Sequence, residues 1–421
     1  MHPPVPPDAG RPPRGVSFAL PSIALLAAAC WLALGRGGAG HDHAVGADGG
    51  QTARAAARTR RASVATELRG VWVSDVDSRV MNSRDAMAAV AAQCATANLN
   101  SLYPVVWSQG ETFYPSDVVA AHGGPRISGR YGLCAADRDP MADWIELGDR
   151  HDLDIVPWFE WGLKVPAASP LARRHPEWLS GDDSGKGTFD QDGTTTAYLN
   201  FVHPDVQRFY EELAVEFVTR YDVPAIQFDD HMSLKTSFGY DDYTLARYRA
   251  ETGRTARPAP DEPAWLAWRA TKLTEFVARM SRAIKKARPG VELSVAPNPY
   301  PWSYDNYVQD WPSWVEAGLV DEVVVQVYRD ELTRFRGELS SPVLAGLRGR
   351  ARLAIGIMAG QKPAPVPIDM IRAQTAMVRD VGYDGFVYFF QESLLRFTAP
   401  GETPESRLDG IRHLIAPPAP P

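Results

Sequence analysis

The sequence predicts a single (β/α)8 TIM barrel, and three observations lead to this fold class. Short β-branched or aromatic runs alternate with amphipathic stretches through most of the 421 residues, a pattern typical of a parallel sheet covered by helices. Eight such units occur, and barrels of this class need about 250 residues and tolerate insertions beyond 400. No Gly-x-Gly-x-x-Gly motif follows the first predicted strand, so an open dinucleotide-binding sheet is disfavoured.

The eight predicted strands are, in chain order, 68–75, 99–106, 154–160, 225–230, 292–298, 322–328, 352–360 and 385–392. The predicted helices between them include 83–98, 140–151, 204–221, 263–287, 311–317 and 368–381. Several begin at Pro or after a capping Ser or Asp, and several stop at Gly or Asn. Long connections are expected after strands two, three and four. They leave the carboxyl ends of the strands, where a barrel builds its active site.

The start of the chain is predicted to lie outside the barrel. Arg11 and Arg14 precede an uncharged apolar run at about 16–34, which is typical of a signal peptide or a membrane anchor. Leu26-Ala-Ala-Ala-Cys30 is similar to a lipoprotein cleavage box, so lipidation of Cys30 is an open alternative. We therefore expect an exported protein of the periplasm or cell envelope that meets a membrane only through this segment.

Composition sets the remaining boundaries of the chain. Segments rich in Gly, Ala and Arg or in Pro lack apolar periodicity and predict a flexible linker and a disordered tail. The expected organisation is a signal or anchor at 1–35, a linker at 36–66, the barrel at 67–414 and a tail at 415–421.

Charge and cysteine content exclude several classes of function. The net charge is −7 and no Lys/Arg run of the kind that forms a phosphate-binding basic face occurs, which disfavours nucleic acid as a partner. Cys30, Cys94 and Cys134 show no metal-ligand spacing, so neither a metal nor another cofactor is predicted. In an exported protein, Cys94 and Cys134 either form a disulfide or remain separate thiols. The oligomeric state is left open.

Alternation along the fourth strand selects the first candidate residues. Ile226 and Phe228 share the face that suits the helix layer, so Asp229 and His231 face the barrel axis. Asp230 is expected to point away unless the backbone turns at the strand end. A strand-end Asp also serves as a helix cap in many barrels, and His231 suits a hydrogen-bonding role better than that of a catalytic base.

Three other strands end in polar side chains. Glu160 shares a face with Trp158 at the end of the third strand, although it also suits an ion pair with an arginine. Gln326 and Tyr328 share a face in a Val-rich sixth strand, where buried polar groups need partners. Glu392 ends the eighth strand.

These side chains suit cleavage of a glycosidic bond. One carboxyl group protonates the leaving oxygen, and another supports the positive charge that develops on the sugar. Aromatic rings at the same end of the barrel stack on sugar faces. The catalytic candidates are Asp229, Asp230, Glu160 and Glu392, and the substrate-binding candidates are Trp107, Trp158, Trp161, His231, Asn298, Trp302, Gln326 and Tyr328.

The chain also resembles a known family along nearly the whole predicted barrel. The matching stretches are Pro157-Trp-Phe-Glu-Trp-Gly162, Ile226-Gln-Phe-Asp-Asp-His-Met-Ser233, 67–74, 100–107, 114–116, 296–299, 309–311, 326–329 and 388–392. They are similar to the glycosyl-hydrolase-like family of bacterial envelope barrels, which is related in fold to the family-ten xylanases. The resemblance implies a (β/α)8 fold and hydrolysis of a polysaccharide. It also implies that Asp229 and Asp230, together with Glu160 and Glu392, are catalytic residues.

One branch of that family acts on peptide-free peptidoglycan strands, so this polymer is the expected substrate. Two retaining mechanisms remain open, double displacement and assistance by a 2-acetamido group of the substrate. Two other classes of function remain alternatives. One is a glycan-binding protein without catalysis, and the other is a metal-dependent carbohydrate esterase built on Asp229, Asp230 and His231.

Overall fold

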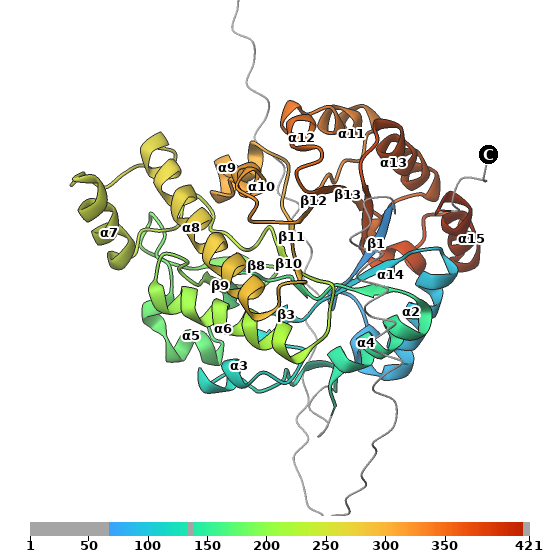
Figure 1. Ribbon diagram of the computed structural model, residues 1–421, viewed down its shortest axis with the longest axis horizontal. Helices are drawn as coiled ribbons and strands as arrows, with labels where there is room; N and C mark the ends of the chain where they lie inside the picture. The colour runs from blue at the N-terminus through green and yellow to red at the C-terminus, as the bar shows by residue number, and fades with distance from the viewer. Residues whose placement is uncertain (1–66, 133–137, 416–421) are drawn as a thin grey trace, which may run out of the picture.

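Parallel strands close into a barrel at the centre of the molecule, with helices around them (Figure 1). The computed structural model describes residues 67–132 and 138–415. The predicted signal or anchor, the lipidation of Cys30, the linker and the tail beyond 415 lie outside these residues. Of the helices within the described ranges, none has the length and apolar character needed to cross a membrane.

The sheet follows the order β5-β2-β1-β16-β13-β12-β11-β10-β6. Its first and last members, β5 (Asp154–Ile155) and β6 (Trp158–Phe159), are two parts of one strand interrupted at Pro157, which has no N–H to donate. The N–H of Val156 bonds to the second strand, at Leu102, and the carbonyl of Pro157 accepts from the fourth, at Gln227. The third strand therefore joins the two edges and closes the barrel.

All eight predicted strands are present. The others are β1 (Leu68–Val73), β2 (Ser101–Pro104), β10 (Ala225–Asp229), β11 (Glu292–Ala296), β12 (Glu322–Gln326), β13 (Arg352–Met358) and β16 (Gly385–Phe389). Most end one or two residues earlier than predicted. The (β/α)8 fold is thus confirmed.

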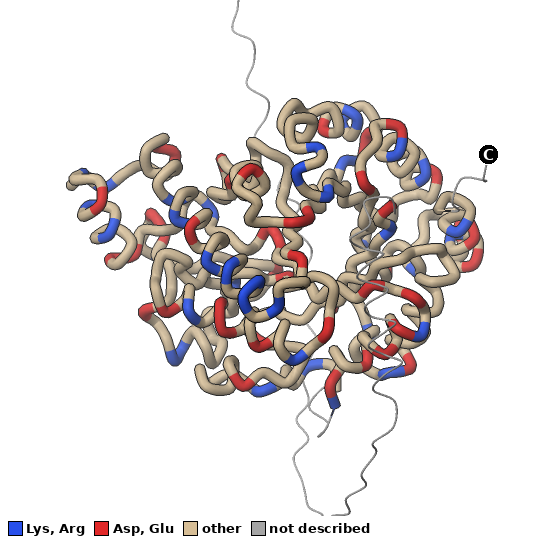
Figure 2. Tube along the Cα trace, in the orientation of Figure 1, with Lys and Arg blue, Asp and Glu red and all other residues tan. Residues whose placement is uncertain are grey.

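The predicted helices are confirmed with small shifts at their ends, as α2 (Arg84–Thr96), α4 (Pro140–His151), α6 (Pro204–Arg220), α8 (Pro263–Ala287), α10 (Trp311–Glu316) and α13 (Ile368–Val381). Cap chemistry explains their starts, since Ser83 and Asp139 accept backbone N–H groups of α2 and α4. Further helices complete the outer layer, namely α9 (Trp302–Tyr307), α11 (Leu332–Leu339), α12 (Pro342–Leu347), α14 (Gln391–Leu395) and α15 (Pro404–Ile415). Acidic and basic residues alternate over the outer helices in Figure 2.

The long connections after strands two, three and four are also confirmed. The first holds a hairpin of β3 (Trp107–Ser108) and β4 (Glu111–Thr112), followed by α3 (Asp117–Ala121). The second holds α5 (Pro170–Arg174) and an antiparallel sheet ordered β7-β9-β8, made of Lys164–Pro166, Thr194–Tyr198 and Phe189–Gln191. The third holds α7 (Asp242–Thr252). A short pair, β14 (Gly360–Gln361) and β15 (Ala364–Pro365), follows β13.

Aromatic side chains fill the barrel interior beneath the carboxyl ends of the strands. The rings of Trp72, Trp158 and Phe389 lie 6.1–6.4 Å apart, centroid to centroid. The Trp72 indole N–H donates to Gln227 at 2.7 Å, and the Gln227 amide donates to Ser294 at 2.9 Å. Inward polar groups thus have partners, and together with the rings they form a packed floor under the site.

The two alternatives for Cys94 and Cys134, a disulfide or separate thiols, both stay open. Cys94 is a free, buried thiol on α2, and burial raises its pKa to about 12. Cys134, the other half of the proposed pair, lies outside the described residues.

Candidate active site

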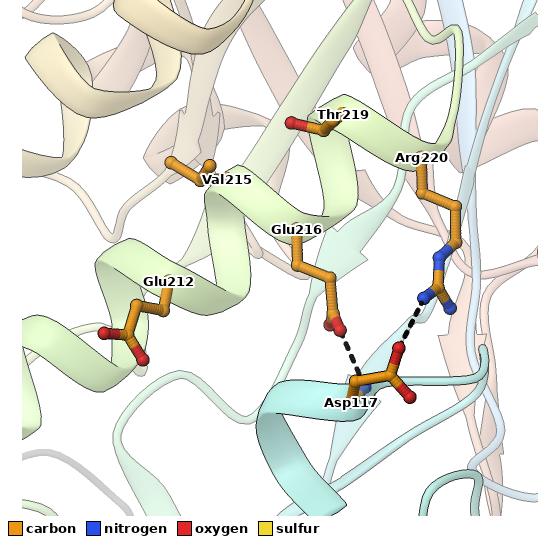
Figure 3. Close-up of a pocket in the computed structure, with 6 residues that line it drawn as sticks. All are labelled: Asp117, Glu212, Val215, Glu216, Thr219 and Arg220. Atoms are coloured by element: carbon orange, nitrogen blue, oxygen red, sulfur yellow. Dashed lines mark hydrogen bonds and ion pairs between the residues drawn. The ribbon is translucent and has the colours of Figure 1, made fainter. Parts of the chain in front are cut away.

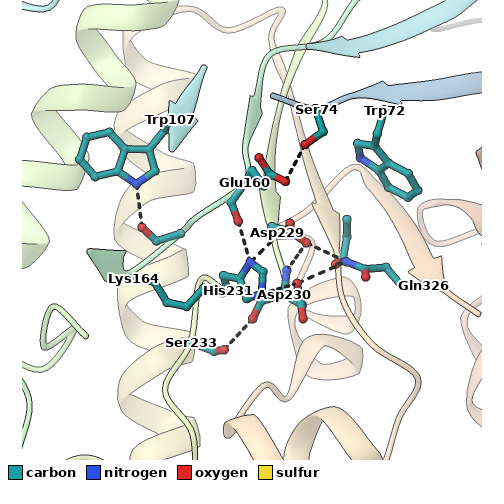
Figure 4. Close-up of polar contacts among 12 residues, drawn as sticks. Trp72, Ser74, Trp107, Glu160, Lys164, Asp229, Asp230, His231, Ser233 and Gln326 are labelled. Atoms are coloured by element: carbon teal, nitrogen blue, oxygen red, sulfur yellow. Dashed lines mark hydrogen bonds and ion pairs between the residues drawn. The ribbon is translucent and has the colours of Figure 1, made fainter. Parts of the chain in front are cut away.

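Polar side chains from several strands meet at the carboxyl end of the barrel (Figure 4). Asp229 is the last residue of β10, and Asp230 and His231 follow it directly. Glu160 follows β6, and Gln326 is the last residue of β12. The structure therefore brings together five of the residues that the sequence singled out.

Asp229 and Asp230 both belong to this cluster. The Asp229 carboxylate accepts the Gln326 amide and the backbone N–H of Asp230, each at 2.7 Å. The Asp230 carboxylate accepts the Asn298 amide at 2.8 Å. Asp230 does not point away, because the backbone turns after Asp229, the exception that the sequence left open, and Met232 N–H bonds back to the Asp229 carbonyl at 3.0 Å. Strand alternation ends at that turn.

The two carboxyl groups have opposite proton affinities. Burial and the neighbouring charge of Asp230 raise the pKa of Asp229 well above its usual range. Burial also opposes ionisation of Asp230, but the charge of His231 when that ring is protonated, hydrogen bonding from Asp229 and the charge of Lys164 outweigh it and lower the Asp230 pKa. The pair therefore holds one proton on Asp229 and one negative charge on Asp230.

His231 is held as a neutral imidazole. Its Nδ1 lies 2.8 Å from the Glu160 carbonyl oxygen, so Nδ1 carries the hydrogen and Nε2 is the acceptor. Burial lowers its pKa to about 4, although the charge of Asp230 acts in the opposite direction. Nε2 lies 3.6 Å from an Asp230 oxygen. The predicted hydrogen-bonding role fits this geometry.

Glu160 belongs to a second carboxyl pair, with Asp75. Ser74 donates to one Glu160 oxygen at 3.0 Å, and the other Glu160 oxygen and one Asp75 oxygen are buried without a hydrogen-bond partner among the described residues. Arg130 pairs with the remaining Asp75 oxygen at 3.1 Å. Burial first, and then the charge of Asp75, raise the Glu160 pKa well above its usual range. Glu160 is therefore a neutral acid beside an ion-paired aspartate.

Comparison with known proteins agrees with this architecture. The glycosyl hydrolase-like 10 family matches residues 67–377. The chain belongs to this family. It is a glycoside hydrolase, and its substrate class is a polysaccharide.

Individual relatives are distant. The glycosyl hydrolase DigH of Escherichia coli K12 is 24% identical over 338 residues, which cover 69% of this chain and 72% of the relative. The glycoside hydrolase domain of PgaB (BpsB) from Bordetella bronchiseptica superposes with a TM-score of 0.61 at 14% identity, covering 83% of this chain and 99% of that one. The β-amylase catalytic domain of Paenibacillus polymyxa gives 0.55 at 13% identity, covering 85% and 100%. These structures show the shared fold.

Two tryptophans predicted to bind sugar have no free face in this glycosyl hydrolase-like barrel. Trp107 has 0% of its surface exposed, and its indole N–H bonds the Gly162 carbonyl at 2.9 Å. Trp158 has 2% exposed, because it belongs to the aromatic floor. Both predictions are corrected, since strand-end position alone does not tell an inward core ring from an accessible one.

The other predicted aromatic residues differ in position. Trp161 is half-buried beneath the Lys164 ammonium, and Tyr328 is half-buried with its ring 5.5 Å from that of Phe389. Burial and the charges of the two strand-four aspartates raise the Tyr328 pKa well above its usual range, which places its hydroxyl near the pair. Trp302 is 47% exposed on α9 and packs on Tyr307.

Glu392 begins a helix rather than ending a strand. It lies in the first turn of α14, where its carboxylate accepts the Ser78 hydroxyl at 2.9 Å and lies 3.7 Å from Arg396. These partners lie outside the hydrogen-bond network of Asp229 and Asp230. The structure therefore does not bring Glu392 into that network.

Sequence reasoning missed Asp75 and Lys164. Asp75 ends the first predicted strand, so the strand-end signal that selected Glu160 also applied to it. Lys164 has no such signal, because it comes from β7 within the second long connection. Its ammonium interacts electrostatically with Asp230, Asp229 and Glu160.

The geometry also bears on metal binding. Ligand atoms of Asp229, Asp230 and His231 all lie within 4.8 Å of one another, and the remaining His231 nitrogen donates to a carbonyl, as metal-binding histidines usually do. Amide donors already bond to one oxygen of Asp229 and to both oxygens of Asp230. These three residues would hold a cation if one binds.

A separate hollow lies on the outer helix layer, between α3 and α6 (Figure 3). Its polar groups pair with one another, since Glu216 accepts the Asp117 backbone N–H at 2.7 Å and Arg220 lies 3.1 Å from the Asp117 carboxylate. These groups come from helices and not from strand ends, so this hollow is distinct from the carboxyl cluster.

Proposed function

We propose that this glycoside hydrolase works outside the cytoplasmic membrane and cuts within peptide-free peptidoglycan strands. The observation that carries the catalytic part is the Asp229–Asp230 pair, two adjacent carboxyl groups whose pKa values move in opposite directions. The apolar N-terminal run supports export. The family's resemblance to envelope barrels that act on peptidoglycan supports the substrate.

In the proposed reaction Asp229 is the general acid. Its proton passes to the leaving oxygen as the glycosidic C–O bond breaks. The carbonyl oxygen of the 2-acetamido group bonds to the sugar C1, while anionic Asp230 accepts the acetamido N–H. Water then attacks C1 and gives a proton to Asp229, while the bond between C1 and the acetamido oxygen breaks and the acetamido carbonyl is restored, so the product retains its configuration.

Neighbouring groups support this division of roles. The Asn298 and Gln326 amides hold the two carboxylates in place, and neutral His231 adds no positive charge that would pull the proton off Asp229. Glu160 also stays neutral, so one negative charge remains beside the reacting carbon. Double displacement by Asp230 is the alternative with the same stereochemistry.

Mass spectrometry of soluble products tests the proposal. The purified protein, its Asp229→Asn variant and a Lys286→Gln control on the exposed last turn of α8 are incubated with peptide-free strands. The parent and the control are expected to release muro-oligosaccharides, and Asp229→Asn is expected to lose about 100-fold or more. Cleavage of another polysaccharide alone would contradict the substrate, and inverted products would contradict both retaining mechanisms.

The metal-compatible geometry of Asp229, Asp230 and His231 favours a second candidate, a metal-dependent carbohydrate esterase. Such an enzyme would release acetate without shortening the strand. Chelation would abolish that release, and divalent cations would restore it. Glycan cleavage that persists in a chelator would reject this candidate.

A further inference from the structure

Two lysines approach the carboxyl cluster from the inserted sheet and the loop after strand four. Lys164, on β7, has 4% of its surface exposed, and its ammonium donates to Gln191 at 3.3 Å and lies 5.1 Å from the Trp161 ring centre. Figure 4 shows it extending toward His231. Lys235 is half-buried, with its ammonium 4.2 Å from the ring centre of Phe189.

Both lysines contact one face of one strand. Phe189 and Gln191 are two residues apart on β8, so their side chains point to the same side, while Asp190 between them is exposed on the other. Residues spaced in this way lie about 7 Å apart. The charge of Lys235 also acts on Lys164 and His231. The two ammonium groups therefore form a cationic wall beside the catalytic pair.

This wall has no carboxylate in direct contact with its ammonium groups. In the part of the chain that the structure describes, neither ammonium has a carboxylate within ion-pair distance, and Lys235 has no hydrogen-bond partner. By contrast, Lys272 and Lys285 on α8 are paired with Glu251 and Asp321. Burial lowers the pKa of Lys164 to about 8, although the charges of Asp230, Asp229 and Glu160 act in the opposite direction, and burial also lowers the pKa of Lys235. An anion bound between the two ammonium groups would give both a charge partner in direct contact.

We propose that Lys164 and Lys235 bind a carboxylate of the substrate, which makes the enzyme specific for carboxylate-bearing glycans. The inference rests on the proposed function and narrows it. In a peptidoglycan strand, alternate sugars carry a lactyl group whose carboxylate is free only after the peptide is removed. Because a peptide converts this carboxylate into an amide, the lysine wall would distinguish peptide-free from peptide-bearing strands.

The test compares substrates that differ in this charge alone. Peptide-free strands are used with free carboxylates and after conversion of the carboxylates to amides, with neutral chitin oligosaccharides as a third substrate. The full-length protein is compared with Lys235→Gln, Lys235→Glu and the Lys286→Gln control. We expect Lys235→Gln to lose about tenfold to a hundredfold in kcat/KM on carboxylated strands, mainly through KM, and little on amidated strands. Lys235→Glu should lose more on carboxylated strands.

Several outcomes would overturn the inference. The inference would fail if the parent cleaved amidated strands as well as carboxylated ones. It would also fail if Lys235→Gln lost the same factor in kcat/KM on both kinds of strand. Cleavage of chitin oligosaccharides in preference to carboxylated strands would leave the hydrolase in place and reject the lysine wall. If no strand is cleaved, the proposed function fails, and calorimetric binding of the two strand types decides the inference by itself. Equal affinity of parent and Lys235→Gln for carboxylated strands would then reject it.

Discussion

Asp229 and Asp230 are neighbours in the chain, yet their surroundings give them different protonation states. Asp229 is the more deeply buried and takes its hydrogen bonds from Gln326 and from the main chain. Asp230 lies nearer solvent and shares the fields of His231 and Lys164. The carboxyl end of β10 thus provides both a protonated acid, Asp229, and a carboxylate anion, Asp230.

Asp75 permits a prediction about Glu160. Its charge helps to raise the Glu160 pKa, so Asp75→Asn lowers that pKa and lets Glu160 ionise at a lower pH. A second negative charge beside the catalytic pair should slow the reaction. We therefore expect the alkaline limb of the kcat/KM profile to move to lower pH, and Asp77→Asn, at an exposed position near Lys362, to leave it in place. A reduced rate with an unmoved limb would mean that Asp75 acts only through packing.

The sequence predicted the site residues unevenly. Alternation placed Asp229 on the inner face, since it holds up to the last residue of the strand, and it no longer applies at Asp230, where the turn begins. Alternation could not distinguish a buried ring such as Trp107 from an accessible ring, because buried and accessible rings both follow strand ends. Lys164 and Lys235 were beyond prediction, since their approach depends on how the β7-β9-β8 sheet folds over the strand ends.

Among the elements, the turn after β6 holds two loops together. Gly162 has a φ of +48°, and a Cβ added there would lie 2.2 Å from the His231 backbone carbon. Its carbonyl accepts the Trp107 indole and the Tyr210 hydroxyl. This position therefore sets the distance between the turn that carries Glu160 and the loop that carries His231.

Gly162→Ala tests this spacing. The clash should displace the strand-four loop, lower kcat about 100-fold and lower the melting temperature. Gly253→Ala is a matched control, because its φ is +71° and no atom lies within 4 Å of the added Cβ. The Gly253→Ala variant should have a strained backbone at residue 253 and an unchanged kcat. Equal kcat losses in the two variants would show that the contact with His231 does not position the site.

The boundaries of the helices and strands show how much the local sequence pattern predicts. Pro in the first turn marks the predicted starts of α4 and α8, Asp139 also caps α4, and Pro367 directly precedes α13. The third strand was predicted as one run, and Pro157 divides it by removing a donor. Hydrophobic periodicity therefore predicted the closed barrel, while the contents of the inserted loops depend on contacts distant in sequence.

For the whole molecule, the buried acids predict how stability depends on pH. Asp229 and Glu160 have raised pKa values in the folded state, so they bind more protons than in the unfolded chain. The contribution of these two carboxyl groups to the stability of the folded state is fully present below the unfolded carboxyl pKa of about 4. It is lost as the pH rises through their raised pKa values in the folded state. The pKa of His231 is lowered in the folded state, so its contribution to stability has the opposite pH dependence. That contribution is lost as the pH falls from about 6.5 to about 4.

Asp229→Asn isolates one part of this dependence. Asparagine accepts the same hydrogen bonds and cannot ionise, so the variant should melt a few degrees higher than the parent at pH 8 and at the same temperature near pH 4. Calorimetry at both pH values measures the difference. A lower melting temperature at pH 8 would show that the Asp229 carboxyl stabilises the fold.

The division of roles within the strand-four pair is tested most directly by changing the leaving group. A disaccharide of the peptide-free strand is linked either to another sugar or to dinitrophenol, which departs without protonation. We expect Asp229→Asn to lose about 100-fold or more on the sugar-linked substrate and to keep near-parent rates on the dinitrophenyl one, while Asp230→Asn loses activity on both. Equal losses by Asp229→Asn on the two substrates would contradict its role as the acid.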